Sequence, residues 1–262
     1  MDTPDRLKET LAGTAIEAGA VRVGFARVDD GVTRSAMELY DSWIANGQNA
    51  AMGYMANHRT LRVNPLLLLA RPGEEAEEVP QEGTVIVAAF SYWWPEEPRG
   101  DVRLAMYARG DDYHDLLRRR LQPLADILAA SGFRARICVD SAPVMEKYWA
   151  VRAGVGFIGR NSLLITPEVG SYLFLAEIIT DAVLPEGCHP SPCMSTDGTE
   201  GSHIGCKGCG ACVRSCPGGA ICPDGTIDAN RCLSYLTIEH RGEWTPQPVS
   251  YTHLTLPTKL EV

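Results

Sequence analysis

The stretch that decides most about this 262-residue chain runs from Cys206 to Pro217 and reads CKGCGACVRSCP. Its four cysteines are spaced C-x2-C-x2-C-x3-C and a proline follows, a pattern that holds 4Fe-4S clusters. Three closely spaced thiolates can bind one face of a cubane, while the fourth cysteine ligates a second cluster in two-cluster proteins. We therefore predict cluster ligands at Cys206, Cys209, Cys212 and Cys216.

Zinc is the main alternative to a cluster, because four-cysteine zinc sites also use C-x2-C pairs. Such sites usually separate the two pairs by a longer loop, so the close spacing in this chain favours the cluster. Cys232 follows Cys216 after sixteen residues and is either a further ligand or a buried thiol. Cys138 falls in an apolar stretch and is expected to be a small core residue. No role is predicted for Cys188, Cys193 and Cys222.

The composition is that of an ordinary water-soluble protein, with 45% hydrophobic residues and a formal net charge of -9. This acidic balance argues against a protein that coats nucleic acid, although it does not exclude an RNA substrate. The first twelve residues lack the apolar core of a secretory signal, and no apolar run is long enough to cross a bilayer. We therefore expect a cytoplasmic protein with no membrane partner. In that reducing compartment, nine cysteines indicate metal or redox chemistry rather than disulfides.

Residues before the cysteine run alternate between helical and extended patterns. Leucines recur at helical spacing from Leu117 to Leu128, which predicts a helix over 113–131 that Pro123 should kink. The unbroken run at 84–90 is suited to a central strand. Further helices are predicted to start near Pro4 and Pro143, and further strands are predicted at 21–25, 133–139 and 172–179. This alternation is typical of an α/β or α+β protein.

Changes in composition divide the chain into four parts. Residues 1–184 carry the alternating helices and strands, whereas residues 185–204 are rich in proline, glycine and serine, as linkers or insertions are. Residues 205–244 hold the cysteine run, and residues 245–262 contain three prolines and no cysteine. We predict a large catalytic domain, a linker, a small iron-sulfur domain and an unrelated or disordered tail, in that order.

Several motifs give the chain a family resemblance. The segment 139–144 reads VDSAPV, and the segment 154–164 reads GVGFIGRNSLL. Together with RGDDYH at 109–114, the cysteine run, and CLSYLTIE at 232–239, they resemble the epoxyqueuosine reductases. This resemblance implies an α+β fold. It consists of a reductive-dehalogenase-like cobalamin-binding domain with a mixed sheet and helices, followed by a partial ferredoxin-like domain.

The resemblance also implies an activity. Members of this family reduce the epoxide of epoxyqueuosine at the wobble position of tRNA, the last step of queuosine biosynthesis, with cobalamin and two 4Fe-4S clusters. Such a reduction needs two electrons and two protons, which ordinary side chains cannot supply alone. The implied partners are a tRNA that bears epoxyqueuosine and an unidentified electron donor. The alternatives are a dehalogenase-like corrinoid iron-sulfur reductase of a small molecule and an electron-transfer module of the ferredoxin type.

Site residues follow from the same resemblance. Asp140 would donate a proton to the opening epoxide, whereas its local context alone favours a cap, with Ser141, for a helix that starts near Pro143. His114 is expected to start a helix or line the pocket rather than to bind cobalt. Asp140 and six further residues would contact cobalamin, although each of the six also fits a tight turn or a surface position. The six are Arg62, Ser141, Gly159, Arg160, Asn161 and Ser162.

The end of the chain departs from the family. Other members carry a second cysteine run after the segment that begins at Cys232, and this sequence has none there. Each cubane takes four thiolates. The first would bind Cys206, Cys209 and Cys212, and the second would bind Cys216 and Cys232, which leaves three ligands missing. We therefore expect a C-terminally truncated family member, in which the truncation can abolish activity.

Overall fold

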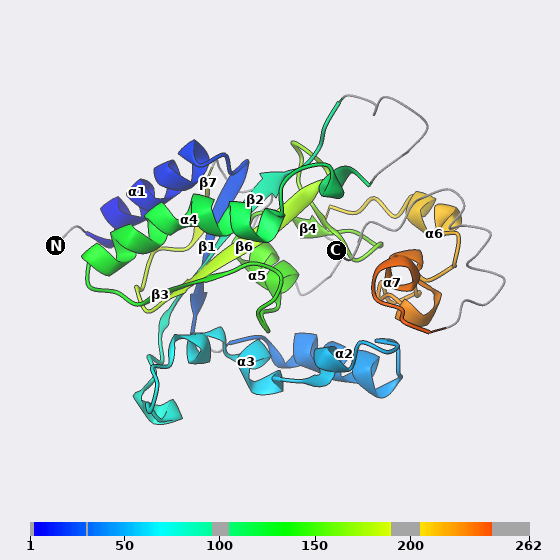
Figure 1. Cartoon of the computed structure of the whole chain (residues 1–262), viewed down its shortest axis with the longest axis horizontal. Coiled ribbons are helices and arrows are strands. Elements are labelled where there is room, and N and C mark those ends of the chain that lie inside the picture. The colour runs from blue at the N-terminus through cyan, green and yellow to red at the C-terminus, as the bar shows by residue number, and fades with distance from the viewer. Residues whose placement is uncertain (1–2, 30, 96–104, 190–204, 243–262) are drawn as a thin grey trace.

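The computed structural model describes residues 3–29, 31–95, 105–189 and 205–242. At its centre lies a five-stranded sheet with the strand order β3-β6-β2-β1-β7, flanked by helices (Figure 1). Its strands are β1 (Arg22–Val28), β2 (Gly83–Ser91), β3 (Ala135–Cys138), β6 (Leu173–Thr180) and β7 (Gly187–His189). The short strands β4 (Phe157–Ile158) and β5 (Leu164–Ile165) pair as a separate hairpin. The run at 84–90 lies in β2, in the middle of the sheet, which confirms the predicted central strand.

Every pairing in the five-stranded sheet is antiparallel, which corrects the expectation of a mixed sheet. Strands β2 and β3 run in the same direction and are joined through helix α4 (Tyr113–Ala130), as in a strand-helix-strand unit. Strand β6 is inserted between them and pairs antiparallel with both. The alternation of helices and strands in the sequence is therefore real, but it produces no parallel pair.

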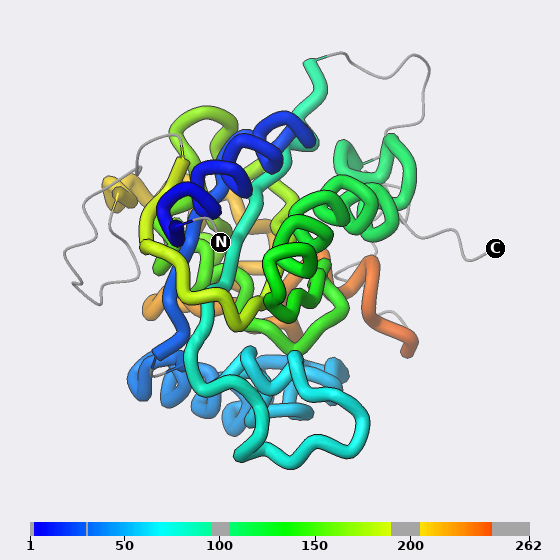
Figure 2. The backbone as a smooth tube through the Cα atoms, turned by 90° about the vertical axis from the view of Figure 1, so that its left-hand side faces the viewer, coloured from blue at the N-terminus to red at the C-terminus, as the bar shows by residue number. Residues whose placement is uncertain are grey.

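Helices α1 (Pro4–Glu17) and α4 cover one face of the sheet (Figure 2). Leu11 of α1 and Leu121 of α4 are buried in one cluster with Ile86 of β2. The predicted start of α1 is confirmed, because the Thr3 side chain caps the helix by accepting a hydrogen bond from the Arg6 amide at 3.4 Å. The predicted leucine row of α4 is also buried, and the helix continues through its internal proline.

The opposite face of the sheet carries helix α5 (Glu146–Arg152) and, further out, a layer formed by α2 (Arg34–Ala45) and α3 (Arg59–Val63) (Figure 1). Trp149 of α5 is fully buried and belongs to the same cluster as Met37 of α2. Leu66 of the 3-10 helix η2 (Pro65–Leu69) completes the contact between the layer and the sheet. This second core fixes α5 between the sheet and the outer layer.

Helix α5 begins at Glu146 rather than near Pro143, and its N-cap residue is Met145. The local alternative, in which Asp140 and Ser141 cap this helix, is therefore excluded. Asp140 adopts a left-handed backbone conformation, with a φ of 56°, and the Ser141 amide donates to the Val139 carbonyl oxygen. A helix cannot propagate through a left-handed residue. Residues 139–145 consequently form a loop that presents Asp140 before the helix starts.

The cysteine-rich unit contains α6 (Ala211–Ser215), η5 (Ala229–Arg231) and α7 (Leu233–Ile238) and lies beside the end of α2 (Figure 1). The indole nitrogen of Trp43 donates to the carbonyl oxygen of Ile227 at 2.7 Å. The Ala51 amide donates to the phenol oxygen of Tyr235 at 3.1 Å. These bonds join segments that are far apart in the sequence, so the small unit is docked on α2 and the residues that follow it.

The remaining short elements are η1 (Gly53–Ala56), η3 (Ala76–Glu78) and η4 (Met106–Ala108). Part of the predicted linker at 185–204 is ordered, because β7 pairs with β1. The rest of that linker and the predicted tail at 245–262 lie outside the described residues. No helix in the described part of the chain is both long enough and apolar enough to cross a membrane.

Candidate active site

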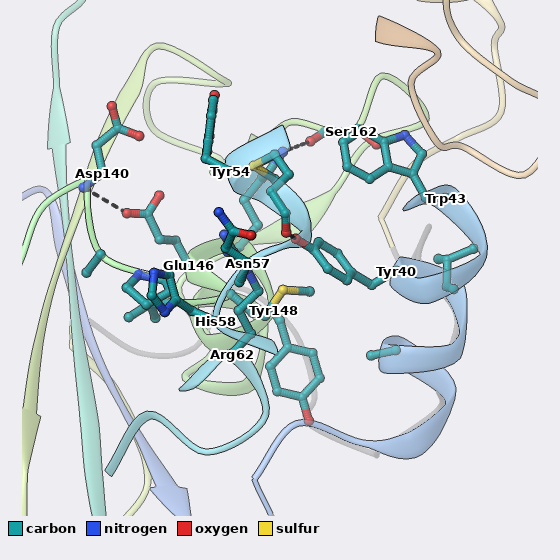
Figure 3. Close-up of a pocket in the computed structure, with 18 of the residues that line it drawn as sticks. Tyr40, Trp43, Tyr54, Asn57, His58, Arg62, Asp140, Glu146, Tyr148 and Ser162 are labelled. Carbon is teal, nitrogen blue, oxygen red and sulfur yellow. Dashed lines mark hydrogen bonds between the residues drawn. The ribbon is translucent and has the colours of Figure 1, made fainter. Parts of the chain in front are cut away.

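A cavity of about 820 Å³ opens between α2, the start of α5 and the cysteine-rich unit (Figure 3). Aromatic rings form much of its wall, with Tyr40 and Trp43 on α2 and Tyr54 on η1. The polar and charged lining residues are Asn57, His58, Arg62, Asp140, Ser141, Glu146, Lys147, Ser162 and Thr226. Such a combination of a broad apolar wall and a few convergent polar groups is typical of a binding site.

Asp140 stands at the edge of this cavity, directly after β3. Its carboxylate accepts a hydrogen bond from the Tyr113 hydroxyl at 2.6 Å and lies 3.3 Å from Nε2 of His114. Its backbone amide donates to Oε1 of Glu146 at 3.0 Å, a bond drawn in Figure 3. The Asp140 side chain is nevertheless 61% exposed. The carboxylate is therefore held in place by α4 while it remains accessible to a molecule in the cavity.

Tyr113 and His114 are fixed by stacking and capping at the start of α4. The Tyr113 ring lies between His114 and Phe174, with ring centroids 4.0 Å and 4.2 Å away. Burial, together with the hydrogen bond to the Asp140 carboxylate, raises the pKa of Tyr113. The tyrosine thus remains a hydrogen-bond donor to Asp140. Nδ1 of His114 lies 2.7 Å from the carboxylate of Asp112, the residue that caps α4.

Two further carboxyl groups lie behind Asp140. Burial, with the nearby Asp140 carboxylate, raises the pKa of Glu146 to about 7. Glu177 is fully buried on β6, where desolvation raises its pKa well above the ordinary value of a glutamate. Among the described residues, neither carboxyl oxygen of Glu177 has a hydrogen-bond partner. An ionised carboxylate in that setting would be strongly destabilising, so burial favours the protonated form of Glu177.

The cationic side chains of the cavity occupy different walls. Arg62, near the end of α3, is buried, donates from Nε to the Asn57 carbonyl oxygen at 3.4 Å and lies over the Tyr40 ring. Lys147 of α5 donates from Nζ to the Ser162 carbonyl oxygen at 2.7 Å. The Lys147 side chain faces the cavity and is accessible from it. Desolvation by the surrounding protein nevertheless lowers the pKa of Lys147.

Residues 159–162 form the turn of the β4–β5 hairpin. The Ser162 amide donates to the Gly159 carbonyl oxygen at 2.9 Å, and the Ser162 hydroxyl donates to the Gly225 carbonyl oxygen at 2.5 Å. A Cβ atom at Gly159 would lie 2.6 Å from Cδ1 of Ile165, so packing inside the hairpin requires glycine there. Hydrogen bonds from backbone amides, including that of Arg160, lower the pKa of Cys206. The turn therefore connects the cavity to the cysteine-rich unit.

The structure brings some of the predicted site residues together and separates others. Arg62, Asp140, Ser141 and Ser162 line one cavity. Gly159, Arg160 and Asn161 belong to the adjoining turn and are not among the lining residues. Their predicted contact with cobalamin stays a prediction.

The cysteines of the run lie in the small unit, around α6. Cys209 is exposed, and Cys206, Cys212, Cys216 and Cys232 are partly buried. Within the described ranges, no three His, Cys, Asp or Glu side chains are grouped closely enough to hold a single metal ion. A cubane places four irons between its thiolates, so its ligands need a wider spacing than those of one zinc ion. Cys138 is buried, as predicted for a core residue, and burial raises its pKa to about 12.

Comparison with known proteins decides the family. Residues 74–141 match the family model described as epoxyqueuosine reductase QueG, DUF1730, and residues 205–253 match the 4Fe-4S double cluster binding domain. An epoxyqueuosine reductase of Synechocystis sp. is 34% identical over 233 residues, which cover 87% of this chain and 72% of that protein. The chain belongs to the epoxyqueuosine reductase family. The resemblance inferred from the motifs is thereby confirmed.

Solved epoxyqueuosine reductases share the fold. One solved epoxyqueuosine reductase contains a tRNA-Tyr epoxyqueuosine-modified stem loop. It matches this chain with a TM-score of 0.74 at 28% identity, and the match covers 92% of this chain and 60% of the relative. A Bacillus subtilis epoxyqueuosine reductase, described with its catalytic aspartate loop swung out of the active site, has a TM-score of 0.72 at 26% identity. It covers 92% of this chain and 59% of that chain. The chain thus spans less than two thirds of the length of these solved relatives.

Several residues that line this cavity or lie next to Asp140 had no assigned role in the sequence. Tyr40 and Tyr54 come from segments with no recognisable motif, and Tyr113 was noted only as part of one. Glu177 carried a usable signal, because it is the only charged residue within the apolar strand LFLAEIIT. A charge in the middle of a buried strand is rare unless it is paired or functional.

Proposed function

We propose that this chain reduces epoxyqueuosine in tRNA to queuosine. The observation that carries the proposal is the cavity in which Asp140 stands near Arg62 and aromatic rings, in a chain of the epoxyqueuosine reductase family. Asp140 is the proposed proton donor. Its carboxylate is accessible and lies on the loop that follows β3. A solved relative is described with a catalytic aspartate loop swung out of its active site, which supports this role.

The proposed reaction removes the epoxide oxygen as water and leaves an alkene. It consumes two electrons and two protons, and a cobalamin would supply the nucleophilic, electron-accumulating centre that side chains lack. The chain's own residues bind the substrate, exclude water and deliver protons. Asp140 protonates the oxygen as the first carbon–oxygen bond breaks, because an alkoxide is a poor leaving group. Tyr113 keeps the Asp140 carboxyl in place during this transfer.

The cavity suits a large flat cofactor. Tyr40, Trp43 and Tyr54 offer an aromatic wall, and Arg62 offers a buried cation that can pair with a phosphate or amide oxygen. We propose that Arg62, Asp140, Ser141 and Ser162 contact the cobalamin. Gly159, Arg160 and Asn161 are proposed to contact it from the adjoining turn.

The cysteine-rich unit would deliver the electrons. We propose that the first 4Fe-4S cluster binds Cys206, Cys209 and Cys212, and that Cys216 and Cys232 belong to the second. The match to a double cluster binding domain supports two clusters in the intact family. Hydrogen bonds of the turn at 159–162 to this unit place the predicted first-cluster ligand Cys206 next to the wall of the cavity. The electron donor to the clusters is unidentified.

The proposed substrate is the anticodon stem-loop of a tRNA that bears epoxyqueuosine, and the proposed location is the cytoplasm. The solved relative that contains such a stem loop supports the choice. The test is anaerobic purification followed by addition of cobalamin and of the modified stem-loop. A corrin spectrum that changes on binding, with formation of queuosine, supports the proposal. Cluster spectra without corrin binding would indicate an electron carrier, and corrin binding without tRNA dependence would indicate a reductase of small molecules.

A further inference from the structure

Glu146 is a second carboxyl group of the cavity, and neither a motif nor the resemblance assigns it a role. It is the first residue of α5 and lines the same cavity as Asp140. In Figure 3 its carboxyl group points toward Asp140, and Oε1 accepts the Asp140 backbone N–H at 3.0 Å. Two carboxyl groups in one pocket commonly divide acid and base roles according to their surroundings.

The surroundings of Glu146 differ from those of Asp140. Asp140 is largely exposed and accepts hydrogen bonds, whereas Glu146 is partly buried at the base of the loop. Charged and titratable groups face Glu146 from each packed element. They are Asp140 on the loop, Lys147 on α5, His114 on α4, Cys138 on β3 and Glu177 on β6. Burial outweighs the opposing effects of Lys147 and His114, so the protonated form of Glu146 is favoured at neutral pH relative to an ordinary glutamate.

The chemistry of the cavity requires a second proton. When the first carbon–oxygen bond of the epoxide breaks, the oxygen takes one proton and becomes a hydroxyl group. When the second breaks, hydroxide must leave with another proton as water while the carbon–carbon double bond forms. Two electrons from the iron-sulfur unit balance the equation. Asp140 carries one proton at a time, so a second acid beside it would supply the other proton without a wait for Asp140 to be reprotonated.

We propose that Glu146 is the second acid of the cavity and gives its proton to the departing hydroxyl group. This role rests on the proposed function. Glu146 also positions Asp140, since its carboxyl oxygen holds the Asp140 amide in the left-handed loop. Glu177 lies behind Glu146 as a buried proton-bearing group, so the interior disfavours ionisation at both positions.

The acid role is separable from the positioning role by substitution. Glu146→Gln keeps an oxygen that accepts the Asp140 N–H but removes the acidic proton. Glu146→Ala removes both. Glu9→Gln, on the exposed side of α1, is a matched control for the loss of one carboxyl group.

The first measurement is a pH titration of 13C-carboxyl-labelled glutamate by NMR on the full chain. We expect one glutamate carboxyl that titrates near neutrality and disappears in Glu146→Gln but not in Glu9→Gln. A Glu146 carboxyl that titrates in the ordinary acidic range overturns the proposal, whether or not the chain turns over.

The second measurement is single-turnover reduction of the modified stem-loop by the cluster- and cobalamin-loaded chain across pH 6–9. We expect the wild-type rate to fall as pH rises above about 7 and Glu146→Gln to be about 100-fold slower without that inflection. If Glu146→Gln turns over at the wild-type rate and only Glu146→Ala is slower, Glu146 acts only by positioning Asp140. That result overturns the acid role. A wild-type chain that binds both cofactors but forms no queuosine contradicts the proposed function instead, and the NMR titration then decides the state of Glu146.

Discussion

Replacement of Glu177 by glutamine should change how the stability of the fold depends on pH. Glu177 is fully buried in β6, and within the described residues neither carboxyl oxygen has a partner. The folded state therefore keeps the proton to a higher pH than the unfolded chain does, since burial raises the pKa of Glu177. Below the unfolded pKa both states are protonated, and the contribution of Glu177 to the stability is at its highest. Above it the unfolded state releases a proton that the folded state retains, so the stability falls as pH rises.

The size of this effect follows from linkage. One group that is protonated only in the folded state lowers the free energy of unfolding by about 1.4 kcal/mol per pH unit. This slope applies between the pKa of Glu177 in the unfolded chain and its raised pKa in the folded chain. Glu177→Gln is nearly isosteric and cannot ionise, so its stability should fall less steeply over the same range. The difference between the two slopes isolates Glu177, because the other titrating groups are common to both proteins.

The assay is reversible urea unfolding of the cluster-free chain, followed by tryptophan fluorescence at pH 5, 6, 7 and 8. Glu9→Gln, at an exposed site, should keep the wild-type slope. Parallel slopes for wild type and Glu177→Gln would refute the reasoning, because they would mean that Glu177 ionises in the folded state at its ordinary pKa.

Three further predictions concern turnover and docking. Asp140→Asn should keep iron and cobalamin binding but lower turnover by at least about 100-fold, because the amide cannot donate an acidic proton; substantial residual activity in a queuosine assay would remove Asp140 from the mechanism. The epoxyqueuosine stem-loop should have a higher kcat/KM than the free nucleoside, since remote binding energy orients the epoxide; equal values would contradict this. Trp43→Phe removes the hydrogen bond to Ile227 and should weaken docking of the cysteine-rich unit by about 1 kcal/mol, which hydrogen exchange would detect as faster exchange over 226–239. Trp93→Phe, at an exposed site, is the control and should leave that exchange unchanged.

The local elements of the fold were predictable because each has its own signal. The leucine row of α4, the cap at Thr3 and the apolar run of β2 all depend on neighbours in the sequence. The pairing of strands was not predictable in the same way. Strand β6 inserts between β2 and β3 because of contacts across the sheet, and no pattern within β6 specifies its partners. The predicted start of α5, near Pro143, was too early for a related reason. The Asp140 carboxylate accepts a hydrogen bond from Tyr113 of a distant helix, and no local pattern indicates this contact.

The candidate site was partly predictable. Asp140, Arg62, Ser141 and Ser162 were expected from motif resemblance, and they line one cavity. Tyr113 and Glu146 acquire their places through packing of α4 and α5 on opposite faces of the sheet. Glu146 in particular looks like an ordinary first-turn glutamate in the sequence. Its raised pKa arises first from burial and then from the nearby Asp140 carboxylate, and only the folded chain creates both conditions.

The most direct test of the central claim is conversion of an epoxyqueuosine-bearing stem-loop by the chain, reconstituted anaerobically with iron, sulfide and cobalamin and supplied with a one-electron reductant. Nucleosides released from the RNA would be identified by mass spectrometry, with Asp140→Asn as the matched control. We predict loss of the epoxide oxygen and formation of queuosine with the wild-type chain and essentially none with the variant. The iron content of two complete cubanes together with a bound-corrin spectrum, but without any queuosine, would contradict the claim that this cavity is an epoxyqueuosine reductase site.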